Sequence, residues 1–343
     1  MSKRVSLPGS GHLAELDLVS YGRRGRHPPL QFSAAQLEQI GRTVSGVPEV
    51  MILVSGGGKS ADAVQAHFAY IDRHGQLEVH TDEGENLQSK EVANYLVDDW
   101  NLDAGKGQYR SGPKVGEKDR RPKQVHNIVF SMPAGTPPEK LLAATQKFAR
   151  EKFALQHRYA MVLHTDQGHP HVHLVVKAQS EDGERLTIRK ATLKEWRQDF
   201  AGYLRELGVA ANATPAALRG KPKDRKKDSI YRALKRGRST FMRRKVERVA
   251  EKLQHGRLAA EPRKAKLLAT RGRVVEHWRT TATLLRAQGQ ESLARGIEAY
   301  VRQMPVVATE KEILAKGLLA QLAAQRARIR SDDREYLVGD RAR

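Results

Sequence analysis

Hydrophobic positions between residues 46 and 215 alternate between the two-residue period of strands and the 3.6-residue period of helices. Because hairpins and helices both join the strands, the expected fold class is α+β with a largely antiparallel sheet flanked by helices. The expected strands are 47–55, 77–80, 125–132, 159–163, 174–176 and 185–188, and the expected helices are 59–73, 88–99, 139–153 and 192–207.

The pattern changes after residue 215, which predicts four parts in the chain. Residues 1–45 are expected to form a basic N-terminal arm with an adaptor helix at 34–42, and residues 46–215 the main domain. Residues 216–245 are expected to be a basic linker, and residues 246–343 a mainly helical C-terminal region. Helices are expected there at 246–253, 265–285, 290–304 and 310–330.

Four histidines lie within ten residues between two of the predicted strands. His171 and His173 alternate with Val172 and Leu174, so the two imidazoles share one face of a strand. His164 ends the preceding strand and can lie across the hairpin from that pair. Three imidazoles that converge on one point can bind a divalent metal and leave coordination positions open. We therefore favour a metal site over purely structural histidines.

The chain is strongly basic, with 61 Lys and Arg against 39 Asp and Glu and a net charge of +22. A polyanion, first DNA or RNA and second an anionic membrane surface, is therefore the expected partner. Residues 219–245 hold 13 Lys and Arg and two Asp, which is half of the net charge. We expect this patch to contact phosphate backbone. The candidate residues are Lys221, Lys226, Lys227, Arg236, Arg243 and Arg244.

Since the chain has no cysteine, a metal must be held by histidine and carboxylate.

A glycine-rich turn, Gly56 to Gly58 followed by Lys59 and Ser60, resembles the end of a P-loop. The first glycine of that motif would fall at Leu53, inside a predicted strand, which excludes an NTPase. The turn can still favour an anion at the start of the following helix.

The histidine segment carries a resemblance to a known family. Residues 164–173 (His-Thr-Asp-Gln-Gly-His-Pro-His-Val-His) are similar to the third motif of conjugative relaxases, the mobilisation nucleases of the HUH endonuclease superfamily, and closest to the MOBP class. Residues 54–58 with 69–75 (Ala-Tyr-Ile-Asp-Arg-His-Gly) resemble the family's nucleophile motif, and residues 126–135 its middle motif. The resemblance covers about residues 47–210, with the motifs in the family's order.

The resemblance implies an HUH/relaxase-type antiparallel sheet and an enzyme that nicks one DNA strand at an origin of transfer. Tyr70 would attack phosphorus, leaving a 5′-phosphotyrosyl bond and a free 3′ hydroxyl without consuming a nucleoside triphosphate. His164, His171 and His173 would ligate a divalent metal, Mg²⁺ or Mn²⁺ in the family generally, with Zn²⁺ also compatible. Asp166 would orient a ligand histidine or accept the tyrosine proton.

Other residues near these motifs are candidates for DNA contacts. Arg73 follows the tyrosine, and Ser131 is the candidate hydroxyl of the middle motif, although a strand-end serine explains it equally well. His169 lies in the loop, and contact with DNA or with metal remains open. Tyr21 competes as the nucleophile, but Tyr70 is preferred because it follows a strand–helix unit and precedes Arg-x-Gly.

The implied partners are single-stranded and duplex origin-of-transfer DNA, accessory relaxosome proteins and a type IV secretion coupling protein. The implied location is the bacterial cytoplasm, with export to a recipient cell in covalent attachment to DNA. No apolar run is long enough to span a bilayer and no signal-peptide pattern begins the chain, so membrane insertion is not expected.

Two other functions fit parts of the sequence. Residues 169–176 match the pattern of histidine-triad nucleotide hydrolases if Pro170 counts as apolar, but the upstream His164-x-Asp166, the Tyr70 helix and the high positive charge oppose that assignment. A non-catalytic basic nucleic-acid-binding protein would explain the charge, but not the convergence of histidines between two apolar strands.

Overall fold

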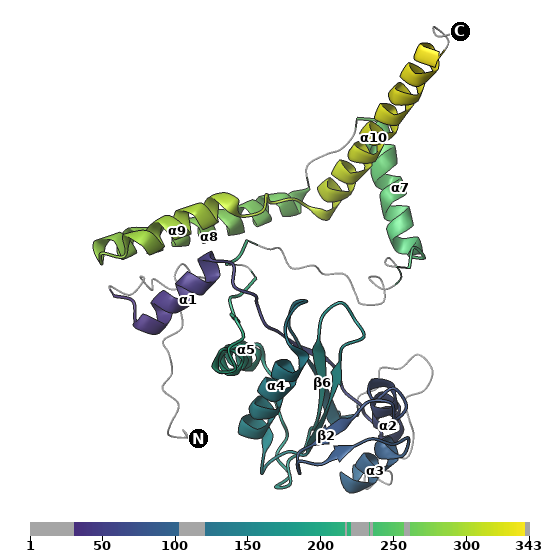
Figure 1. Ribbon diagram of the computed structural model, residues 1–343, viewed down its shortest axis with the longest axis vertical. Helices are drawn as coiled ribbons and strands as arrows, with labels where there is room; N and C mark the ends of the chain where they lie inside the picture. Colours follow the sequence, from purple (N-terminus) through teal and green to yellow (C-terminus); the bar gives the residue numbers. More distant parts are fainter. Residues whose placement is uncertain are drawn as a thin grey trace. The chain divides into compact units, whose positions relative to one another are not determined.

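The structure is a computed structural model of the chain (Figure 1). It describes residues 31–102, 121–216, 218–220, 233, 236–256 and 261–339. The chain divides into two compact units, one of residues 45–214 and the other of residues 1–44 with 215–343. The candidates Tyr21, Lys221, Lys226 and Lys227 lie outside the described residues.

A six-stranded sheet with the order β1-β4-β6-β5-β2-β3 forms the centre of the 45–214 unit (Figure 1). Every neighbouring pair of strands is antiparallel, which confirms the predicted α+β class. The strands are β1 (Met51–Gly56), β2 (Val79–Thr81), β3 (Asn86–Leu87), β4 (Val125–Ser131), β5 (Tyr159–His164) and β6 (His171–Lys177).

Helices cover both faces of this sheet, α4 (Pro138–Phe153) and α5 (Lys190–Glu206) on one and α2 (Ala61–Ile71) and α3 (Val92–Asp99) on the other (Figure 1). The alternation of β4 divides its side chains between the two cores, as the sequence predicts. On the α4–α5 side the core includes Ile128, Phe130, Met132, Phe148, Trp196 and Phe200. On the α2–α3 side it includes Val64, Phe68, Trp100, Val125, Val162 and Val175.

The strand expected at 185–188 is not present. Within the part of the chain that the structure describes, an isolated bridge between Gln179 and Arg185 is the only pairing of this segment. Leu186 and Ile188 pack against the α4–α5 core, so their alternation reports burial rather than strand pairing. The two-residue strand β3 was not expected.

The glycine turn between β1 and α2 is required by close packing. A Cβ atom on Gly57 would clash with the carbonyl oxygen of Val125, and one on Gly58 with the side chain of Val64. The helix then starts at Ser60, whose side chain accepts a hydrogen bond from the backbone N–H of Ala63. The glycines therefore have a structural reason that involves no bound phosphate.

The second unit is helical, which confirms the prediction for the C-terminal region. Its helices are α1 (Ala34–Val44), α7 (Thr240–Gln254), α8 (Pro262–Ala287), α9 (Glu291–Gln303) and α10 (Glu310–Gly339). Ile40 of α1 shares a buried core with Trp278 and Ile297, so the helix expected in an N-terminal arm packs with the C-terminal region. No helix in the described part of the chain is both long and apolar enough to cross a membrane.

Candidate active site

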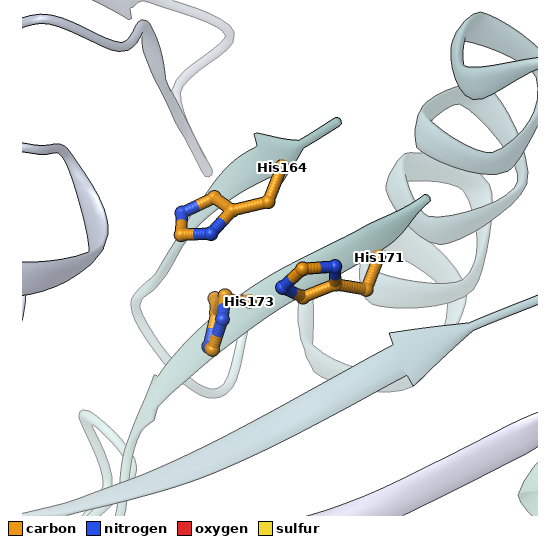
Figure 2. A group of neighbouring side chains, drawn as sticks. All are labelled: His164, His171 and His173. Carbon is orange, nitrogen blue, oxygen red and sulfur yellow. The ribbon is translucent and has the colours of Figure 1, made fainter. Parts of the chain in front are cut away.

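Three histidines converge at one point of the sheet (Figure 2), on the same side of their strands as Val162 and Val175 of the α2–α3 core. His164 of β5 pairs directly with His171 of β6, and His173 lies two residues further along β6 on the same face. The ring centroids are 5.0 Å apart for His164 and His171, 4.6 Å for His164 and His173, and 5.2 Å for His171 and His173. One donor atom from each ring lies within 4.8 Å of the others.

Backbone carbonyl groups fix the tautomers of two of these rings. The Nε2–H of His164 donates to the carbonyl oxygen of Ile71 at 2.6 Å, because a carbonyl can only accept. The Nδ1–H of His171 likewise donates to the carbonyl oxygen of His169 at 3.3 Å. The ring lone pairs are therefore on Nδ1 of His164 and Nε2 of His171. Such backbone contacts orient the rings of metal-binding histidines.

Burial keeps the three imidazoles neutral. Desolvation lowers the pKa of His164 and of His171 and lowers the pKa of His173 to about 3. The Nδ1 of His173 is buried and has no hydrogen-bond partner among the described residues. A neutral imidazole with an unused nitrogen is the form that binds a metal.

The three donors fit a divalent metal ion. Metal–nitrogen bonds of about 2.1 Å place two ligand nitrogens at most about 4.2 Å apart, so a small closure of the rings would bring all three nitrogens to one ion. Three protein nitrogens leave further coordination positions for a phosphate oxygen or water. His164, His171 and His173 therefore form a group that could hold a metal ion.

Tyr70 lies near the end of α2, and its side chain is 53% exposed. The next residue, Ile71, is buried and supplies the carbonyl group that binds His164. The helix ends there because Arg73 and His74 adopt the left-handed conformation, with φ of 56° and 57°. Gly75 follows with φ of 82°, where a Cβ atom would clash with Ser89.

This turn directs Arg73 back onto the site. Its Nη1 donates to the carbonyl oxygen of Tyr70 at 3.0 Å, and its guanidinium carbon lies 5.4 Å from the centroid of the Tyr70 ring. Its Nη2 lies 3.2 Å from Nδ1 of His164 and donates to Oδ2 of Asp166 at 2.7 Å. One side chain thus joins the tyrosine, one of the three histidines and the acidic residue.

Asp166 faces Arg73 more closely than it faces the histidines. Its Oδ1 is 4.0 Å from Nδ1 of His164, beyond hydrogen-bond distance. The hydrogen bond from Arg73 lowers the pKa of Asp166, so this carboxylate is ionised near neutral pH. The geometry favours a positioning role through Arg73.

Two other predicted site residues lie near the cluster without joining it. Ser131 is buried, and its hydroxyl donates to the carbonyl oxygen of Pro170 at 3.3 Å. His169 is exposed, and its carbonyl oxygen accepts the hydrogen bond from His171. His169 would be the first histidine of the histidine-triad pattern. The group of converging imidazoles contains His164 in its place, which weakens that assignment.

His67 is a neighbour of the cluster that the sequence analysis did not assign. Its ring centroid lies 6.4 Å from that of His173, and its Nε2 is buried without a hydrogen-bond partner among the described residues. Burial lowers the pKa of His67. The spacing of three residues between His67 and Tyr70 on α2 was the available signal, because residues three apart share a helix face.

The described residues of the basic patch belong to the other compact unit. Arg236, Arg243 and Arg244 are exposed there, the last two on α7. Their DNA contacts stay predictions.

Comparisons with known proteins identify part of the chain. Residues 79–209 match the family described as "Relaxase: MobA/VirD2-like, nuclease domain", a match that begins after Tyr70 and Arg73. Over 184 residues the chain is 25% identical to the T-DNA border endonuclease VirD2 of Rhizobium radiobacter, which covers 50% of this chain and 42% of that protein. For the protein of the same name from Agrobacterium fabrum the identity is 26% over 184 residues, covering 50% of this chain and 40% of the relative.

The chain therefore spans less than half the length of these relatives. A solved structure described as "Molecular Basis of Vancomycin Resistance Transfer in Staphylococcus aureus" is 12% identical, covers 49% of this chain and 99% of its own, and has a TM-score of 0.30. The family match includes β5 and β6, which carry His164, His171 and His173. The part of the chain that holds the histidine cluster is thus similar to the nuclease domain of MobA/VirD2-like relaxases.

Proposed function

We propose that the chain nicks one strand of origin-of-transfer DNA by transesterification. The observation that supports this proposal most directly is the link that Arg73 makes between Tyr70 and His164. The Arg73 guanidinium contacts both the exposed Tyr70 ring and His164, one of the three converging imidazoles. That combination of nucleophile and metal ligands suits attack on a phosphodiester.

In the proposed reaction the Tyr70 oxygen attacks the scissile phosphorus. The bond from phosphorus to the 3′ oxygen breaks as the tyrosine–phosphorus bond forms, which leaves a 5′-phosphotyrosyl bond. The tyrosine loses one proton and the departing 3′ oxygen gains one, so the number of phosphoester bonds is conserved and the strand can be rejoined.

The other residues of the site would position the reacting groups and offset the negative charge of the phosphate. The guanidinium of Arg73 lies over the Tyr70 ring and carries a positive charge there, and Asp166 accepts a hydrogen bond from it. Lewis-acid polarisation of the phosphate would come from Mg²⁺, Mn²⁺ or Zn²⁺ held by His164, His171 and His173.

The substrate and partners follow from the family alone. We propose single-stranded and duplex origin DNA as substrates, with accessory relaxosome proteins and a secretion coupling protein as partners, in the bacterial cytoplasm. The two VirD2 relatives are named for endonuclease activity at T-DNA borders, which is consistent with a DNA substrate.

A paired substitution tests the nucleophile. Tyr70→Phe removes one oxygen and is expected to abolish nicking of origin DNA with Mn²⁺ while binding is retained. Tyr95→Phe makes the same change on an exposed tyrosine of α3 and is expected to leave nicking unchanged. Full nicking by Tyr70→Phe would exclude Tyr70 as the nucleophile.

A further inference from the structure

Arg73 donates a hydrogen bond to the single ring lone pair of His164, on Nδ1. The Nε2–H of His164 is used by the carbonyl oxygen of Ile71 at 2.6 Å, so only Nδ1 of the neutral ring can accept. Nη2 of Arg73 lies 3.2 Å from that Nδ1. A guanidinium group has no acceptor and cannot lose its proton in a protein, so it must be the donor.

A metal ion would need the same lone pair. His164 cannot offer Nε2 without breaking its bond to Ile71, which holds the end of α2 against β5. The ring is 1% exposed, so it has little room to turn over. Nδ1 is therefore the ligand atom of His164, and its lone pair cannot serve an N–H group and a metal at once.

The backbone holds Arg73 in this position. Arg73 and His74 have φ of 56° and 57°, which is uncommon for residues with side chains and folds the chain back toward the cluster. Asp166 anchors the guanidinium at 2.7 Å, and the carbonyl oxygen of Tyr70 accepts from its other nitrogen at 3.0 Å. The guanidinium therefore keeps two partners when its bond to His164 is broken.

We propose that Arg73 and the divalent metal compete for Nδ1 of His164, so that metal binding displaces Arg73 from His164 but not from Asp166. This inference rests on the proposed metal site. It assigns to Arg73 a role in metal affinity, beyond the DNA contact expected from the sequence. It also couples metal binding to the position of the cation beside Tyr70.

Calorimetric titration of the whole 343-residue chain with Mn²⁺ tests the competition. Arg73→Gln removes the competing donor, and we expect Mn²⁺ to bind roughly tenfold more tightly than in the wild type, because a hydrogen bond to a charged group no longer has to be broken. Arg150→Gln makes the same charge change on an exposed residue of α4, on the opposite face of the sheet, and is expected to leave the affinity unchanged.

Ionic strength separates competition from simple charge repulsion. Repulsion between exposed charges is screened at high salt, whereas competition for one lone pair is not. A gain in Mn²⁺ affinity that persists in 1 M salt, where the Debye length is about 3 Å, supports the competition. A gain that is absent, or that disappears in 1 M salt, overturns it. If neither the wild type nor Arg73→Gln binds Mn²⁺, the metal site itself fails.

A measurement on the wild-type chain avoids any effect of substitution on folding. Addition of Zn²⁺, which is diamagnetic, is expected to shift the side-chain N–H signals of Arg73 in nitrogen–proton spectra and to leave those of Arg150 unchanged. Unchanged Arg73 signals, in a sample where the signals of the three histidines report bound Zn²⁺, would also overturn the competition.

Discussion

The imidazole of His164 donates a hydrogen bond of 2.6 Å to the backbone carbonyl oxygen of Ile71, the residue after Tyr70. This bond joins the end of α2 to the end of β5, two elements that are far apart in the sequence. It fixes the tautomer of one proposed metal ligand and holds the helix that carries the proposed nucleophile. This buried contact adds to the apolar packing of Val64, Phe68 and Ile71 that holds α2 against the sheet.

The proposed metal site predicts that substitutions of two neighbouring histidines change the affinity for Mn²⁺ very differently. His171→Ala should weaken Mn²⁺ binding by about 100-fold or more, because loss of even an outer-sphere partner of a metal ligand costs about 10–100-fold. His169→Ala should leave the affinity unchanged, since the His169 side chain is exposed and lies outside the cluster. Isothermal titration calorimetry of both variants with Mn²⁺ measures these affinities. An equal loss of affinity in the two variants would show that His169 is a metal ligand.

When EDTA has removed any bound metal, the free energy of unfolding of the chain should fall as the pH drops below 6.5. His173 has a pKa lowered to about 3 by burial, so it stays neutral in the folded state while the unfolded chain takes up a proton near pH 6.5. The unfolded state binds more protons between these values, so His173 costs about 2 kcal/mol of stability at pH 5 relative to pH 7. The groups that face it are His67, His164, His171 and Arg73.

Urea unfolding at pH 7 and pH 5 measures this cost. The loss of unfolding free energy on acidification should be smaller in His173→Gln than in the wild type, whatever the substitution does to stability at pH 7. The exposed His255, which follows the last residue of α7, provides the control, since His255→Gln should retain the full loss. Identical losses in the wild type and His173→Gln would contradict the buried neutral imidazole.

Asp166→Asn should impair activity without affecting stability. The ion pair with Arg73 is largely exposed, and such pairs contribute about 0–1 kcal/mol. Loss of the carboxylate charge weakens the hold on Arg73, so single-turnover nicking at saturating DNA should slow by about tenfold. Asp182→Asn, in an exposed turn after β6, should match the wild type in both measurements. A normal nicking rate in Asp166→Asn would remove this residue from the mechanism.

If the basic patch at residues 219–245 contacts DNA phosphates, part of the salt dependence of DNA binding should come from its arginines. Replacing Arg236, Arg243 and Arg244 together by Gln should flatten the plot of log K against log salt by about 2–3 units of slope, at about 0.9 per phosphate contact on duplex DNA. The same replacement at Arg273, Arg279 and Arg302, which are exposed on α8 and α9, should leave the slope unchanged. Equal slopes for the two variants would show that Arg236, Arg243 and Arg244 are not part of the DNA-binding surface.

Local patterns in the sequence predicted the parts of the site that depend on strand geometry. Alternation along a strand places His171 and His173 on one face, and the short loop to β5 brings His164 opposite them. The same alternation in β4 correctly divides Ile128 and Phe130 from Val125.

Features that depend on contacts between residues far apart in the sequence, or on left-handed backbone conformations, could not be predicted from local patterns. The inward direction of Arg73 requires left-handed φ values at two residues and the approach of α2 to β5. The error at 185–188 arose because Leu186 and Ile188 are half-buried without strand partners. The packing of Ile40 with Trp278 joins segments more than 200 residues apart, which periodicity cannot reveal.

The central claim is that Tyr70 becomes covalently bonded to DNA. Its most direct test is incubation of the chain with single-stranded origin DNA and Mn²⁺, followed by proteolysis and mass spectrometry of the peptide–oligonucleotide adduct. We predict a 5′-phosphate bond to Tyr70 that forms only with metal and is absent from Tyr70→Phe. An adduct on Tyr21 or another residue, or cleavage of the strand without any adduct, would contradict the account.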